Sequence, residues 1–236
     1  MPTRAVQPLD RPYIMAGTLI ALMAVIGFWP TYLQPLFTGA SEAGQVIHFH
    51  ATVYFGWLAL FVAQAWLAAS GRLALHMKVG RVGMIYGIAM IFVGLLVTFS
   101  QFADRVAAGN FPAAQSRLLY PFTDMLIFPA FFGAAIAYRR KPQIHKRWMI
   151  VASTYLLVAA VLRMPIIGSP RSQVLFIGIW ITPIVLAMVH DYVRQRLIHP
   201  VYLIGIAALA ASGYRDVIRE TGMWRIFTEW LATLFV

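Results

Sequence analysis

The 236-residue sequence contains no cysteine, so disulfides, iron–sulfur clusters, thiolate metal centres and covalently attached c-type haem are all excluded. Charge is also scarce: Asp, Glu, Lys and Arg make up 11% of the residues, against about 25% in a typical soluble domain. Acidic residues are the scarcest class, with 8 against 19 basic ones. So little charge cannot cover a water-soluble surface, and a single integral membrane domain over residues 1–236 is predicted.

The chain has long apolar runs instead, with 61% hydrophobic residues and a mean hydropathy of +0.74. A helix needs about 20 mostly apolar residues to cross a bilayer. Seven segments reach or approach that length: 13–37, 46–69, 79–102, 120–138, 148–167, 173–193 and 199–214. The sequence therefore predicts an all-α polytopic membrane protein with about seven transmembrane helices. Residues 103–119, the longest connection, are expected to form an exposed loop.

The last 16 residues, 221–236, are too short to cross a membrane but have helical periodicity. Arg225 and Glu229 fall off a face that is formed by the apolar side chains Trp224, Phe227, Trp230 and Leu231. A helix with one apolar and one charged face lies in the membrane interface. We therefore expect an interfacial amphipathic helix at the C-terminus.

Basic residues concentrate in the connections on one side of the predicted bundle. Twelve of the 19 lie there: Arg4, Arg11, Arg72, Lys78, Arg81, Arg139, Arg140, Lys141, Lys146, Arg147, Arg194 and Arg196. Connections rich in Lys and Arg stay in the cytoplasm, which predicts a cytoplasmic N-terminus and a periplasmic C-terminus. The net charge of +11 fits contact with anionic lipids, and no nucleic-acid-binding motif accompanies it.

All six histidines lie at the ends of apolar runs, where they divide into two sets. On the predicted outer side, His48 and His50 begin the second span, and Asp124 lies in the first turns of the fourth. A cofactor or metal site is one interpretation. Side chains at i and i+2 on a helix diverge by about 200°, which favours His50 over His48 as the inward residue. Arg163, near the outer end of the fifth span, is expected to form a structural ion pair with Asp124.

The inner set consists of His76, His145, His190 and His199 with Asp191. Three imidazoles and a carboxylate, from His76, His145, His199 and Asp191, could bind zinc or non-haem iron, and two opposed imidazoles could bind haem. No H-E-x-x-H, H-x-x-x-H or E-x-x-H motif supports a particular site. Histidines at a membrane interface also bond to backbone carbonyls or lipid phosphates, and that alternative stays open for each of them.

Three segments carry a family resemblance: HFHATVYFGWLALFVAQAWLAASGRLALHMKVGRVG, YPFTDMLIFPAFFGAAIAYRRKPQIHKRWMIVASTYLLVAAVLR and HDYVRQRLIHPVYL. Together with the tail TGMWRIFTEWL they resemble a family of bacterial seven-helix membrane proteins of unknown function. The positions that match its recurring pattern are His48, His50, His76, Asp124, His145, Arg147, Arg163, Asp191 and His199. His190 does not match, which lowers its standing as a ligand. The resemblance implies a bacterial inner-membrane protein and no particular activity.

Three functions are consistent with these patterns. The leading one is an inner-membrane protein that binds haem or a divalent metal, zinc or iron, and has a redox or electron-transfer role. The second is a metal-dependent hydrolase of a lipid-like substrate, with Asp191 or Asp124 as general base. The third is a non-catalytic accessory subunit that binds other membrane subunits. Under the leading hypothesis, alanine at His145 or at His199 is expected to remove the cofactor.

Overall fold

A computed structural model describes residues 11–168 and 172–235; Arg4 and Arg171 lie outside this part. Within it the chain is helical and contains no strand. A π-helical turn, η1 (Trp29–Leu33), and a 3-10 turn, η2 (Pro165–Ile167), interrupt the α-helices. The α-helices are α1 (Arg11–Phe28), α2 (Gln34–Thr38), α3 (Gln45–Ala69), α4 (Leu73–Ala107), α5 (Phe111–Ala137), α6 (Pro142–Tyr155), α7 (Val158–Val161), α8 (Gln173–Gln195), α9 (Pro200–Gly213), α10 (Asp216–Arg219) and α11 (Gly222–Ala232).

Five helical segments among the described residues are long and apolar enough to cross a membrane. They are Pro12–Thr38, Gln45–Ala69, Leu73–Ala107, Phe111–Ala137 and Gln173–Gln195. These segments correspond to five of the seven predicted spans, so the all-helical fold is confirmed and five helices fit the prediction of membrane crossings. The other two predicted spans, 148–167 and 199–214, are shorter or broken helices.

The predicted fifth span is divided because α6 ends at Tyr155. The amide of Leu157 bonds back to the Thr154 carbonyl at 3.0 Å, and Trp180 Nε1 donates to the same carbonyl at 2.9 Å. This second donor comes from α8, so the break depends on a tertiary contact. The predicted seventh span is continuous but short, because the 14 residues of α9 extend only about 21 Å at 1.5 Å per residue.

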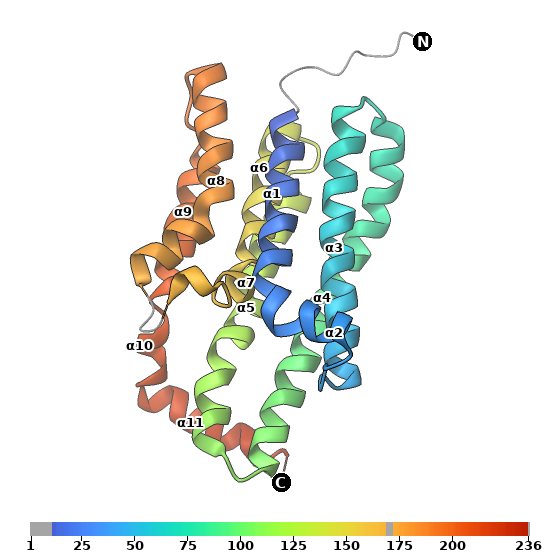
Figure 1. Cartoon of the computed structure of the whole chain (residues 1–236). Coiled ribbons are helices and arrows are strands. Elements are labelled where there is room, and N and C mark those ends of the chain that lie inside the picture. Colours follow the sequence, from blue (N-terminus) through green and yellow to red (C-terminus); the bar gives the residue numbers. More distant parts are fainter. Residues whose placement is uncertain (1–10, 169–171, 236) are drawn as a thin grey trace.

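The predicted loop over residues 103–119 is wrong, because α4 and α5 are joined by residues 108–110 alone. Asn110 caps α5 by accepting a bond from the Ala113 amide at 3.3 Å, and Pro112 lies in the first helical turn. Both residues are favoured at helix starts. The extra turns lengthen α4 and α5 at the end of the bundle where α11 lies (Figure 1).

The connections α3–α4, α5–α6 and α8–α9, which together with the adjoining helix ends carry most of the predicted inner-side basic residues, lie at the opposite end (Figure 1). Between the two ends α1 packs against α3, α6, α7 and α8. Gly27 permits the closest of these approaches: a Cβ there would lie 2.5 Å from the carbonyl carbon of Ala160 and 2.8 Å from its Cα. Contact between α1 and α7 thus fixes the position of the residues that follow Ala160.

The C-terminal helix α11 packs on protein with part of its predicted apolar face. Thr221 caps it, accepting a bond from the Trp224 amide at 3.2 Å. Trp224 and Leu231 are buried in a cluster with side chains of α4 and α5, whereas Trp230 is 56% exposed. Trp230 therefore does not belong to the packed face on which the periodicity placed it.

Candidate functional site

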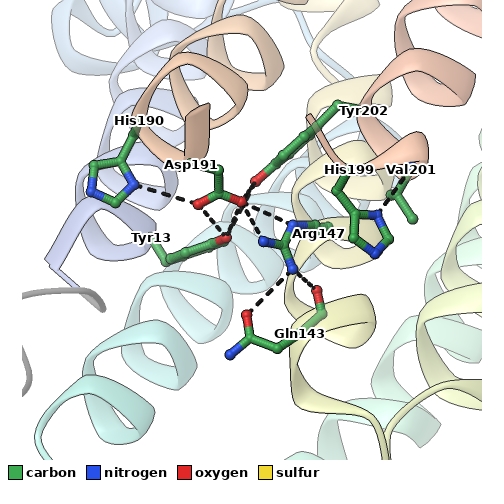
Figure 2. A network of polar contacts seen from close by, with 8 residues as sticks. All are labelled: Tyr13, Gln143, Arg147, His190, Asp191, His199, Val201 and Tyr202. Atoms are coloured by element: carbon green, nitrogen blue, oxygen red, sulfur yellow. Dashed lines mark hydrogen bonds and ion pairs between the residues drawn. The ribbon is translucent and has the colours of Figure 1, made fainter. Parts of the chain in front are cut away.

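A buried polar cluster near the basic end surrounds the carboxylate of Asp191, on α8 (Figure 2). Arg147 of α6 donates to Asp191 Oδ2 from Nε at 2.9 Å and from Nη2 at 2.5 Å. Tyr202 of α9 donates to the same oxygen at 2.8 Å, and Tyr13 of α1 donates at 3.0 Å. Asp191 is 1% exposed and Arg147 2%. Four helices are therefore joined through one carboxylate, which is occupied by these donors.

Arg147 is further fixed within its own helix. Its Nη1 donates to the carbonyl and side-chain oxygens of Gln143, one turn earlier, the latter at 3.3 Å (Figure 2). A buried ion pair is stable only when its remaining donors and acceptors are also satisfied. These bonds meet that condition, and they leave Asp191 poorly suited to bind a metal ion or to accept a proton as a general base.

The two histidines of the α8–α9 hairpin lie beside this cluster (Figure 2). His199 is the N-cap of α9, and its Nδ1 accepts the Val201 amide at 3.3 Å. His190 Nδ1 lies 3.5 Å from Asp191 Oδ1. His190, which the resemblance removed from the candidates, is therefore in contact with Asp191, while His199 has a local role in starting a helix.

The other two inner histidines close neighbouring hairpins. His145 Nδ1 lies 2.7 Å from the Ala135 carbonyl oxygen, which joins α6 to α5. His76 Nδ1 lies 3.2 Å from the Gln64 carbonyl oxygen, which joins α4 to α3. Burial lowers the pKa of His145, and His76 is close enough to lower it further, although the bond to Ala135 opposes both effects. His145 is therefore neutral at pH 7, and an Nδ1–H bond to the Ala135 carbonyl would leave its Nε2 as the unprotonated nitrogen.

The tautomer of His76 depends on the Gln64 side chain as well. With its amide nitrogen turned to the ring, Gln64 would donate to His76 Nδ1 at 2.6 Å and would accept the Gly80 amide at 2.9 Å. With the amide oxygen facing the ring, Nδ1 keeps its proton for the backbone carbonyl. The Gln64 amide thus determines which nitrogen of His76 has a free electron pair.

The predicted inner ligand set is not brought together. His76 is within electrostatic reach of His145, whereas His199 and Asp191 belong to the cluster around Arg147. Among residues 11–168 and 172–235, no group of three or more His, Asp or Glu side chains is placed to hold a metal ion. The division arises because His76 and His145 are held at the α3–α4 and α5–α6 hairpins, while Arg147 draws Asp191 to the other side of α6.

A second buried cluster surrounds Asp124, on α5. Arg215, which follows α9, donates from Nη2 to Asp124 Oδ1 at 2.5 Å and from Nη1 to the Tyr155 hydroxyl at 2.6 Å. Tyr155 in turn donates to Asp124 at 3.1 Å. Burial alone would lower the pKa of Arg215, but Asp124 and Tyr155 raise it overall. The predicted pair of Asp124 with Arg163 is therefore wrong, because Arg215 occupies the carboxylate.

The predicted outer histidines have different neighbours because α3 is already helical from Gln45. His48 Nδ1 lies 3.0 Å from the Tyr32 hydroxyl, in the π-helical turn η1. The His50 ring centroid lies 4.1 Å from that of Tyr54, with the ring planes tilted by 33°, and its Nδ1 is buried without a hydrogen-bond partner. Neither imidazole contacts Asp124, so the predicted outer metal set of His48, His50 and Asp124 is also separated.

Sequence analysis did not identify Tyr13, Tyr155, Tyr202 or Arg215 as members of these clusters. Apolar helices often carry tyrosine as a packing residue, and no spacing distinguishes a tyrosine that bonds a carboxylate. Arg215 resembled one more basic residue of an exposed tail. Comparison with known proteins adds nothing to the geometry: no family model, no curated protein and no solved structure matches this chain.

Proposed function

We propose that this protein binds haem through His76 and His145 and takes part in electron transfer in the bacterial inner membrane. The observation that carries the proposal is the placement of these two imidazoles. They come from neighbouring hairpins, each has its Nδ1 at a backbone carbonyl, and a charge on His76 is within reach of His145. A histidine ligand is commonly oriented in this way, with one nitrogen bonded to a carbonyl and the other directed to the metal.

The number of imidazoles favours haem over a metal ion held by protein alone. A structural zinc site requires four protein ligands and a catalytic one three, but the described residues offer no such group. Two imidazoles would suffice to hold a haem, which needs no third protein ligand. When bound, the haem would supply one-electron chemistry. The chain's own contribution is to hold the two imidazoles at neighbouring hairpins, with the Ala135 carbonyl fixing the tautomer of His145.

Alanine substitution separates this site from the rest of the inner set. Full-length protein purified from haem-supplied cells should have a Soret band, and His76→Ala and His145→Ala should each lose it. His199→Ala is the matched control and should keep the band, because His199 caps α9. If the two histidines bind a metal ion and no haem, the Soret band should be absent and elemental analysis should find stoichiometric iron or zinc. Absence of both, or a band that survives in both alanine variants, would contradict the proposal.

An accessory role in a larger membrane assembly is the second candidate. It is favoured by the closure of both carboxylate clusters, in which Asp124 and Asp191 are each bonded to an arginine and to tyrosine. Such clusters stabilise helix packing and need no substrate. Co-purification of further subunits without haem or metal would support this role. The hydrolase alternative has no comparable support, because the same bonds occupy both of its expected general bases.

We also propose seven membrane crossings, a cytoplasmic N-terminus and a periplasmic C-terminus. In this arrangement α6 with α7 forms the fifth crossing and the short helix α9 the seventh. Support comes from the chain direction, which reverses between α3, α4, α5, α6, α8 and α9, and from the gathering of basic connections at one end (Figure 1). The basic end would face the cytoplasm and its anionic lipids.

A further inference from the structure

Arg163, the predicted partner of Asp124, has a different environment from the two buried arginines. It follows α7, its side chain is exposed, and it has no carboxylate within salt-bridge distance among the described residues. Its Nη1 donates to the Ala159 carbonyl at 2.6 Å, and its guanidinium lies 5.1 Å from the ring of Phe28. Most of the donors of this guanidinium therefore have no partner within the described chain.

His50 provides a second polar group beside this arginine. Arg163 is close enough to His50 for its charge to act on the imidazole. The His50 Nδ1 is buried and has no hydrogen-bond partner, and a buried polar atom without a partner is rare in a native protein. The Tyr54 ring, whose centroid lies 4.1 Å from that of the imidazole, limits the rotation of the His50 side chain. Two incomplete hydrogen-bonding groups on different elements are thus within electrostatic reach of each other.

Packing contacts link Arg163 to α3, the helix that carries His50. The close approach of Gly27 to Ala160 sets the end of α7 against α1, which places Arg163 over Phe28. Phe28 also packs edge-on against Phe55 of α3, at 6.1 Å between ring centroids. The π-helical turn η1 begins at the next residue, and such turns are frequent at functional sites.

We propose that His50 and Arg163 form a binding site for a phosphate-type oxyanion, which accepts hydrogen bonds from the guanidinium and the imidazole. The charge of Arg163 opposes a metal cation at His50 and favours an anion. A guanidinium has a planar set of donors that matches phosphate oxygens. Either a lipid headgroup or free phosphate supplies this chemistry. The site is independent of the proposed haem, because its residues are not shared with His76 or His145.

Imidazole NMR of the full-length protein in zwitterionic detergent tests the site directly. With ¹⁵N-labelled histidine, the His50 resonances are assigned as those lost in His50→Gln. Inorganic phosphate and short-chain phosphatidylglycerol are titrated separately, and phosphatidylcholine of the same chain length serves as the reference. Saturable movement of the His50 resonances with phosphate indicates a free oxyanion, whereas movement with phosphatidylglycerol alone indicates a lipid headgroup. Either result supports the site.

Arg163→Gln should weaken the binding by at least about tenfold, because it removes the charged donors. Arg139→Gln is the matched control: Arg139 is also exposed and donates to a backbone carbonyl, that of Ile136 at 3.1 Å, but belongs to the basic end. Unmoved His76 and His145 resonances establish that the variants fold, and Arg163→Lys should retain part of the affinity. The proposal is overturned if neither probe moves His50, if phosphatidylcholine moves it equally, or if both glutamine variants bind alike.

Discussion

Asp191→Asn should destabilise the folded protein by about 3–5 kcal/mol, the typical cost of removing one partner of a buried ion pair. Asparagine has nearly the shape of aspartate, so packing changes little and the charge is what is lost. Arg147 would then be a buried cation, 2% exposed, facing a neutral amide. The hydroxyl groups of Tyr13 and Tyr202 would also lose their charged acceptor. Loosening of α1, α6, α8 and α9 follows, since all four meet at this carboxylate.

Unfolding in detergent by heat or by added denaturing surfactant measures this effect. The exposed pair of Arg225 with Glu229, 3.8 Å apart, provides the control, and Glu229→Gln should cost less than about 1 kcal/mol. Replacing both members, Arg147→Met with Asp191→Leu, should recover most of the loss because no uncompensated charge remains. A stability equal to the wild type in Asp191→Asn alone would show that the cluster does not hold the helices together.

Much of the helix pattern could be predicted because an uninterrupted apolar run is a local property of the sequence. Hydropathy located the segments that contain α1, α3, α4, α5 and α8. The break after Tyr155 could not be predicted in this way, since it depends on a bond from Trp180, 25 residues further along. The α4–α5 connection is a different case: Asn110 and Pro112 were interpreted as loop residues, although both also belong to the start signal of a helix.

The candidate site could be predicted in its residue types but not in its pairings. Asp124 attracted attention because a charge inside an apolar run needs a partner, Asp191 because a carboxylate beside histidines could bind a metal, and Arg147 because it matches the family pattern. The choice of partner depends on which side chain reaches the same depth in the folded bundle. Arg163 matched Asp124 by estimated depth, but the chain beyond α9 returns Arg215 to the same carboxylate. Burial depth after folding, unlike hydropathy, is not a local property.

Arg215→Met should therefore destabilise the protein by about 3–5 kcal/mol, whereas Arg163→Met should change the stability by less than about 1 kcal/mol. The first substitution leaves Asp124, 8% exposed, as a buried carboxylate with only the Tyr155 hydroxyl as donor. The second removes an exposed guanidinium that has no carboxylate partner among the described residues. Methionine preserves the apolar stem of each arginine, so the comparison isolates the charged group.

The double substitution Arg215→Met with Asp124→Leu tests which arginine is the partner of Asp124. If Arg215 is the partner, losses measured for Arg215→Met and Asp124→Leu should not add, and the coupling between them should reach the 0.5–3 kcal/mol or so found for contacting residues. The same cycle with Arg163→Met and Asp124→Leu should be additive within about 0.5 kcal/mol. Strong coupling to Arg163 and none to Arg215 would restore the pairing expected from the sequence. Arg215, and no longer Arg163, would then be the arginine without a carboxylate partner.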